Sequence, residues 1–226
     1  MINLKSIRFI TLVAFFKIAI LILYVYLDVN DKITGNYIRY LFTGLSLITF
    51  IVIAVYLLGI LKFLGEGNSV LIAFKIFIGF ELASFVANMA VSLLLFPKHP
   101  NGYLYYFTIV EIVRFFVFLY LSIQLTRIQD PILKSSFVFF GVAALVNLIL
   151  AAVMPFYVSY MVKSMIVKPT ESTIHHIYTY SGMANMLPII AVLIILNQVQ
   201  ERLNYAEGTA KKDPFFIGYE EKSEEK

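Results

Sequence analysis

The sequence predicts an all-α, polytopic membrane helix bundle of about six transmembrane helices, and three observations lead to that prediction. Of its 226 residues 60% are hydrophobic and the mean hydropathy is +0.84, whereas soluble domains are roughly 45–50% apolar. Charged residues make up only 14% of the chain, and twelve of the 32 follow Val199. The remainder forms long apolar blocks, each able to cross ~30 Å of hydrocarbon at ~1.5 Å per residue.

The apolar blocks are separated by short polar turns and breaks such as Pro97–Gly102. Lys17 interrupts the first block and no cleavage site follows, so we expect a retained helix rather than a signal peptide. The fifth block is too long for one straight span, and Pro155 is expected to kink it or to end its membrane part, leaving residues 156–168 at the interface. The six predicted spans are residues 7–27, 38–64, 70–96, 103–126, 132–165 and 177–199.

Two regions follow from this pattern: a transmembrane bundle over residues 1–199 and a charged tail over residues 200–226. The tail is expected to begin as a helical extension, and its apolar patch at residues 215–219 either stays solvated or docks on a partner or on the chain's own bundle. With the N-terminus inside, eight Lys and Arg flank the spans on the inner side and five on the outer side. This bias predicts cytoplasmic termini and a multi-pass protein of the cell membrane.

Four ionisable residues are predicted near the middle of the bilayer. Counted from the start of their spans, Lys17, Glu81 and Arg114 lie ~15 Å deep and Glu111 ~12 Å deep. Glu111 and Arg114 are three positions apart, share one helix face and are expected to pair. Glu81 has no partner on its own helix, so we expect its counter-charge from another helix, with Lys17 the candidate by depth. The cluster is either a structural set of salt bridges or a proton or ion path.

The motif S-x-x-A-N-M occurs twice, at residues 84–89 in the third predicted span and at residues 181–186 in the sixth. The 97-residue offset maps the first three spans onto the last three, as in the inverted repeats of transporters, and it also pairs Gly44 with Gly141. Against duplication, both asparagines lie at similar depth, whereas inversion would place them at opposite depths. Without duplication, the motif still predicts a polar lining in which the two carboxamides face each other. Its residues are Ser84, Asn88, Ser181 and Asn185.

Several function classes are disfavoured by what the sequence lacks. The absence of cysteine excludes Fe–S clusters and thiolate zinc sites. His99, His175 and His176 lie in predicted loops or at a span's edge, so we expect no haem, no metal site and no other cofactor. The chain has no nucleophile elbow, zinc-protease, P-loop or Rossmann motif, and its basic residues form no nucleic-acid-binding face. We therefore expect neither an enzyme nor a nucleic-acid partner.

The sequence favours an ion- or proton-coupled transporter or conducting component. In this hypothesis Glu81 and Glu111 are the titratable groups, Arg114 and Lys17 the counter-charges, and the asparagines the polar lining. The alternative is a non-catalytic structural or anchoring subunit of a larger membrane complex. Besides the lipid bilayer, the partners would then be other membrane subunits or further copies of the chain in a homo-oligomer. The two hypotheses differ in where the mid-depth charges point: into the chain's own interior in a transporter, toward lipid or a partner in a subunit.

Overall fold

The computed structural model describes residues 2–30, 32, 36–94, 100–163 and 182–206. Within these ranges the chain is helical and has no strand. Six helices are long and apolar enough to cross a membrane, which confirms the predicted all-α, multi-pass membrane bundle. The elements are α1 (Leu4–Val29), α2 (Asn36–Phe63), α3 (Asn68–Leu94), α4 (Pro100–Leu125), α5 (Pro131–Lys163), the short 3-10 helix η1 (Gly182–Asn185) and α7 (Met186–Ala206).

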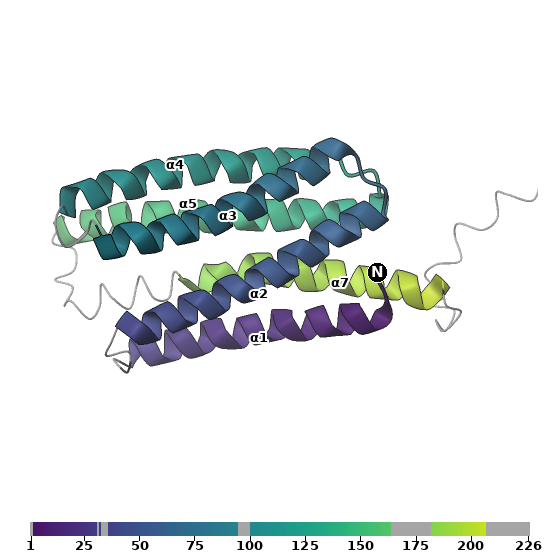
Figure 1. The fold of residues 1–226 in the computed structure, drawn as a ribbon, viewed down its shortest axis with the longest axis horizontal. Coiled ribbons are helices and arrows are strands. Elements are labelled where there is room, and N and C mark those ends of the chain that lie inside the picture. The colour runs from purple at the N-terminus through teal and green to yellow at the C-terminus, as the bar shows by residue number, and fades with distance from the viewer. Residues whose placement is uncertain (1, 31, 33–35, 95–99, 164–181, 207–226) are drawn as a thin grey trace, which may run out of the picture.

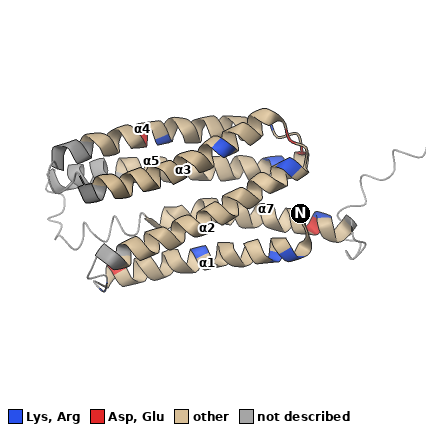
Figure 2. Ribbon diagram, viewed as in Figure 1, with Lys and Arg blue, Asp and Glu red and all other residues tan. Residues whose placement is uncertain are grey.

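The six long helices form a ring in which each packs against the next along the chain and α7 closes the ring against α1. Figure 1 shows α3, α4 and α5 grouped above α1, α2 and α7. One end of the bundle holds the start of α1, the α2–α3 loop, the α4–α5 turn and the end of α7 (right in Figure 1). We call it the basic end, because Figure 2 shows Lys and Arg gathered there, and we call the half of the bundle nearest to it the basic half.

Local sequence explains how the helices start and turn at the basic end. Asn3 caps α1: its side chain accepts a hydrogen bond from the Ser6 amide at 2.8 Å, and the Ser6 hydroxyl accepts one from the Asn3 amide at 3.1 Å. Asp130 caps α5 by accepting from the amides of Ile132 and Leu133, with a proline at the first helical position. Gly65 turns the chain between α2 and α3 at φ +71°, a conformation that favours glycine.

The apolar core is concentrated in the basic half. The largest fully buried side chains include Phe74 and Phe77 early in α3, Leu57 and Leu61 late in α2, and Phe137 early in α5. Phe77 makes edge-to-face contacts with rings from three other helices, an arrangement that aromatic pairs prefer. The opposite half contributes less: on α4 no residue of the described side chains between positions 105 and 120 is buried.

α5 continues through Pro155 to Lys163 as one helix, and its candidate membrane span ends at Val153, so the kink or membrane end expected at Pro155 stays a prediction. One expectation about a helix boundary was wrong. α4 begins at Pro100, so the predicted break ends there and this proline takes the first helical position, where its missing N–H costs nothing. As expected, the tail begins as a helix, since α7 runs past Val199 to Ala206. The patch at residues 215–219 lies outside the described residues.

Candidate functional site

The candidate site is an ion-paired cluster halfway along α3 and α4. The Arg114 guanidinium donates from Nε to Glu81 Oε1 at 3.0 Å and from Nη1 to Glu111 Oε1 at 2.5 Å. The first pair joins α4 to α3, and the second lies within α4. We call these three residues the Arg114 triad. The side chains of Arg114 and Glu81 are each 20% exposed and that of Glu111 is 32% exposed, so all three are largely covered by the chain itself.

The helical period of α4 explains why the triad points inward. The exposed residues around it are apolar, among them Ile109, Ile112 and Phe116. At ~100° per residue these three lie on one side of the helix, and Arg114 lies on the other. α4 therefore has an apolar outer face and a charged inner face at the same depth. Glu81 sits at the corresponding inner face of α3, whose early turns bury Phe74 and Phe77 on that side.

Lys17, the fourth predicted member of the cluster, does not join the triad. Its ammonium donates to the Ser46 carbonyl oxygen on α2 at 3.0 Å and lies 5.1 Å from the centre of the Phe50 ring. It is within electrostatic range of Glu81, but no ion pair in the described part of the chain joins them. The predicted partner of Glu81 was therefore wrong: the counter-charge does come from another helix, but from Arg114. Depth along a span gives no information about neighbours, and α2 separates α1 from α3 in the ring.

The predicted polar lining is only partly brought together. Ser84 is buried on α3, one turn from Glu81, and Asn88 lies one turn farther along the same helix. Asn88 does not face Asn185, which instead accepts a hydrogen bond from Asn147 on α5 at 2.7 Å and donates to the Gly182 carbonyl oxygen at 2.8 Å. The facing-carboxamide prediction was wrong because Asn185 lies in η1, which packs against α1, α5 and α7 rather than against α3. Ser181 lies outside the described residues.

Sequence reasoning missed two polar residues in the opposite half. Asn147 stands alone in the apolar run from Phe137 to Val153, a signal that could have identified it. Tyr106 on α4 has a buried hydroxyl, and the Asn88 Oδ1 atom on α3 is also buried; within the described structure neither atom has a hydrogen-bond partner. Such atoms are costly in an apolar medium, so polar groups with spare bonding capacity lie between the triad and the end of the bundle opposite the basic end.

A second network, also missed, closes the basic end. Glu66 in the α2–α3 loop is buried, and its carboxylate accepts hydrogen bonds from the backbone amides of Gln129 and Asp130 in the α4–α5 turn at 3.0–3.3 Å. Asp130 caps α5 with one oxygen and pairs through the other with Arg202 on α7 at 2.5 Å. We call this set of residues the Glu66 bridge. It ties together the α2–α3 hairpin, the α4–α5 turn and α7, three parts of the chain that lie far apart in sequence.

Comparison of this chain with protein-family models, with curated proteins and with solved structures finds no match. Its activity must therefore be argued from the geometry of the site. Within the described ranges, no three His, Cys, Asp or Glu side chains come together as metal ligands would. What the Arg114 triad offers chemically is two carboxylates that can each take up a proton, held by one guanidinium that cannot lose its own.

Proposed function

We propose that this six-helix membrane protein is a small, non-enzymatic transporter or ion-conducting component of the cell membrane that uses the Arg114 triad as a proton-binding site. The observation that carries the proposal is the sharing of one guanidinium by two carboxylates halfway along α3 and α4. Ionisable residues at membrane depth are rare, and they mark ion pathways and proton relays.

Charge counting gives the triad its chemistry. Two ionised carboxylates and one guanidinium carry a net charge of −1, and Lys17, the fourth charge at this depth, is held by a carbonyl oxygen on α2. An excess negative charge in a low-dielectric environment is costly. Uptake of one proton by either carboxylate removes that excess, so the triad supports two protonation states that differ by one proton.

The two carboxylates differ in what their protonation would release. The Glu81–Arg114 pair links two helices, whereas the Glu111–Arg114 pair spans one turn of a single helix. Protonation of Glu81 would weaken the ionic tie between α3 and α4 and leave Arg114 paired with Glu111. Glu81 is therefore the residue at which proton binding is converted into movement of one helix relative to another, and Glu111 holds Arg114 in place during that change.

The direction of the charges supports transport over the subunit alternative. Arg114 turns to α3, and Lys17 turns to α2. The exposed side chains beside them are apolar, for example Ile112 beside the triad and Phe16 beside Lys17. A subunit that used these charges to bind a partner would instead present them on the outer surface of the bundle.

Proton flux into vesicles tests the proposal. The purified chain is reconstituted into liposomes that contain a pH-sensitive dye, and an imposed pH gradient drives uptake in the presence of sodium, potassium or chloride salts. We expect flux in the wild type and its loss in Glu81→Gln, because Gln keeps the size and a hydrogen-bond acceptor but cannot be ionised. Glu201→Gln is the matched control, since Glu201 is exposed near the end of α7 and bonds only to Asn197 in the described contacts.

Two outcomes would count against the proposal. If Glu81→Gln vesicles keep the wild-type, pH-dependent flux, Glu81 is not the proton-binding residue. If wild-type vesicles conduct no ion under any of these salts, the non-catalytic subunit becomes the better description. Thermal unfolding of each variant in detergent separates a loss of function from a loss of fold.

A further inference from the structure

Exposed basic side chains surround the basic end of the bundle. They come from α1, α2, α3, the α4–α5 turn and α5, so almost every element at that end contributes. Within the described contacts none of them forms an ion pair. We call this set the basic rim; it consists of Lys5, Arg8, Lys62, Lys75, Arg127 and Lys134.

The acidic residues at the same end do not neutralise the rim. Glu66 is buried and its carboxylate is occupied by backbone amides. Asp130 is occupied by the start of α5 and by Arg202. Among the described residues at that end only Glu201 is an exposed acid, and it bonds to Asn197 on its own helix. Among the described residues, the accessible charge at the basic end is therefore strongly positive.

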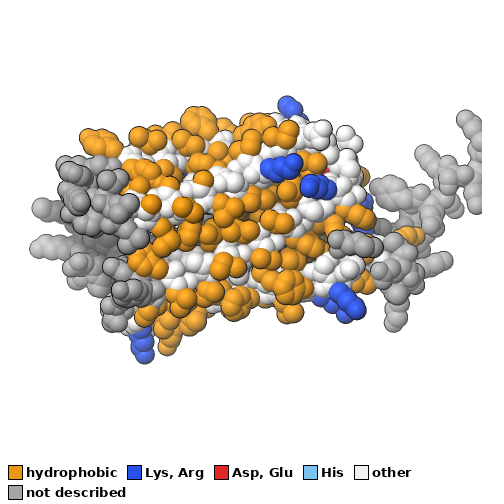
Figure 3. Space-filling view, in the orientation of Figure 1, with side chains coloured by type: hydrophobic (Ala, Val, Ile, Leu, Met, Phe, Trp, Pro, Cys, Tyr) orange, Lys and Arg blue, Asp and Glu red, His pale blue; other side chains and the backbone are white. Residues whose placement is uncertain are grey.

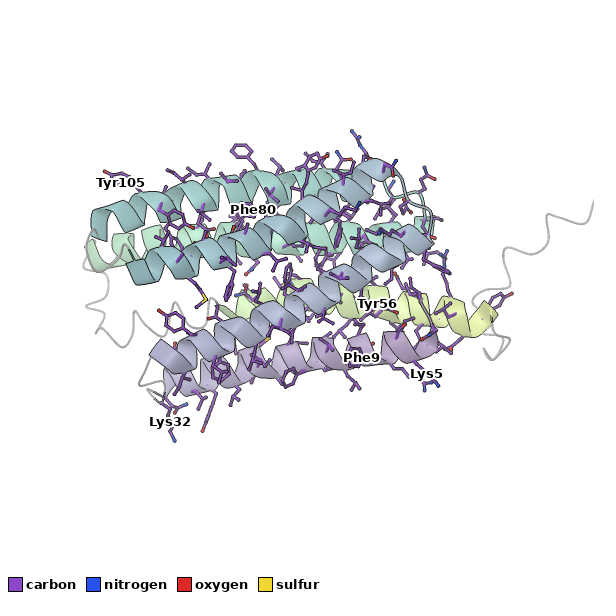
Figure 4. The ribbon with its side chains drawn as sticks, viewed as in Figure 1. Lys5, Phe9, Lys32, Tyr56, Phe80 and Tyr105 are labelled. Carbon is purple, nitrogen blue, oxygen red and sulfur yellow. The ribbon has the colours of Figure 1, made fainter. Side chains whose placement is uncertain are left out.

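The rim faces sideways, along the surfaces that the helices expose to lipid. Lys62 follows Val55 by seven residues and Ile48 by fourteen, which places all three on one face of α2, and both apolar residues are more than half exposed. Lys75 lies in the sequence between Ile72 and Ile76, two exposed apolar residues of α3. Lys5 lies beside the exposed Phe9 on α1 (Figure 4). Figure 3 shows Lys and Arg side chains toward the basic end of a surface that is largely hydrophobic.

The depth of Lys75 identifies the kind of partner. It lies seven residues into α3, which is ~10 Å along the helix from Asn68. A lysine stem of this length reaches back along apolar surface to place its ammonium at the level of the headgroups. A soluble polyanion or an acidic protein would approach from water at the end of the bundle, and it would not reach an ammonium that emerges from the side between isoleucines.

From these observations we infer that the basic rim binds the headgroups of anionic phospholipids in the adjoining leaflet. The ammonium and guanidinium groups supply charge to the phosphate diester, and the exposed Val, Ile and Phe residues of the same faces contact the acyl chains. Juxtamembrane basic residues are attracted to anionic lipid in this way within a Debye length of the surface. The inference is independent of the transport proposal, because it uses no residue of the Arg114 triad.

Thermal unfolding in lipid nanodiscs tests the inference. The full chain is placed in discs of phosphatidylcholine alone or of phosphatidylcholine mixed with phosphatidylglycerol, and native mass spectrometry counts the phosphatidylglycerol retained. We expect phosphatidylglycerol to raise the wild-type Tm by about 2–4 °C, and the double variant Lys62→Gln, Lys75→Gln to lose about half of that rise and to retain fewer anionic lipids. Lys32→Gln is the matched control, because Lys32 is exposed at the other end of α1 (Figure 4).

Each other result overturns the inference. An equal Tm rise in the wild type and the double variant would show that the rim does not bind the lipid. If Lys32→Gln lost as much of the Tm rise as the double variant, the rise would depend on the net charge of the protein and not on the basic rim. If glycerol phosphate in the buffer raises the Tm of wild-type protein in phosphatidylcholine discs as much as phosphatidylglycerol does, the rim binds a soluble phosphate rather than a membrane lipid.

Discussion

The basic half and the opposite half of this bundle are stabilised in different ways. In the basic half, large side chains such as Phe74 and Phe137 are fully buried, and the Glu66 bridge connects loops and helices that are remote in sequence. In the opposite half fewer side chains are buried, and the Asn88 Oδ1 atom and the Tyr106 hydroxyl have no hydrogen-bond partner in the described structure; in the basic half the same holds for Gln124 Oε1. The Arg114 triad lies at the boundary between the two.

The contrast indicates which part of the chain can rearrange. The aromatic rings packed around Phe77 resist displacement, and so does the Glu66 bridge, whose polar groups are hydrogen-bonded. Each has one favourable arrangement. Polar groups with spare bonding capacity can exchange partners at lower cost. A transport cycle driven by the triad would therefore move the opposite half against a fixed basic half, and the three predictions below test that division from the largest expected effect to the smallest.

The largest effect is expected for Arg114→Gln. This change leaves two carboxylates facing each other without a guanidinium, and removal of one partner from a buried ion pair typically costs about 3–5 kcal/mol of stability. Because both acids can escape the repulsion by binding protons, the loss should shrink as the pH is lowered. The measurement is the free energy of unfolding in detergent as a function of pH, with Arg127→Gln as the control, because Arg127 is an exposed arginine in the turn that follows the same helix.

The structure also changes what is expected of the acids in the triad. If Glu111 were the sole partner of Arg114, Glu111→Gln would leave the guanidinium without a counter-charge. In the structure Arg114 has Glu81 as a second partner at 3.0 Å. Glu111→Gln should therefore cost clearly less than Arg114→Gln. Equal losses in these two variants, or a pH-independent loss in Arg114→Gln, would mean that Arg114 does not hold both carboxylates.

How far the sequence predicts the structure depends on whether a relation lies within one helix or between helices. The spans and the Glu111–Arg114 pair were predictable, because hydrophobic length and the i, i+3 spacing are properties of a single helix. The partner of Glu81 and the partner of Asn185 were not, because periodicity and depth leave open which helices are neighbours. The cap that Asp130 forms before Pro131 could have been read from the sequence, but its bond to Arg202 could not.

An intermediate effect is expected for Glu66→Ala, which breaks the bridge at its centre. The backbone amides of Gln129 and Asp130 would lose their acceptor, and a hydrogen bond to a charged group contributes about 1.5–3 kcal/mol. Hydrogen–deuterium exchange should become faster at these two amides and at the start of α5, while exchange in α4 near the triad stays unchanged. Glu201→Ala removes an exposed acid at the same end as a control; unchanged exchange at Gln129 in Glu66→Ala would show that the bridge does not fix this half.

The smallest effect compares two glycines that stand 97 residues apart in the sequence. A Cβ at Gly141 on α5 would lie 3.1 Å from the Ser122 Cα and from the Leu125 Cδ1 on α4, whereas a Cβ at Gly44 on α2 would meet nothing within 4 Å. In Gly141→Ala these α4 atoms would have to give by a few tenths of an ångström, so we expect a cost of about 1 kcal/mol, the lower end of the range for overpacking. Gly44→Ala, in the opposite half, should be neutral or slightly stabilising, because alanine restricts the unfolded chain more than glycine does. Thermal unfolding of both variants in one detergent gives the comparison directly.

Equal changes in Tm for the two variants would show that the two halves do not differ in packing at these glycines. They would also favour an internal repeat, because an internal repeat predicts similar surroundings for Gly44 and Gly141, whereas the structure gives them different ones.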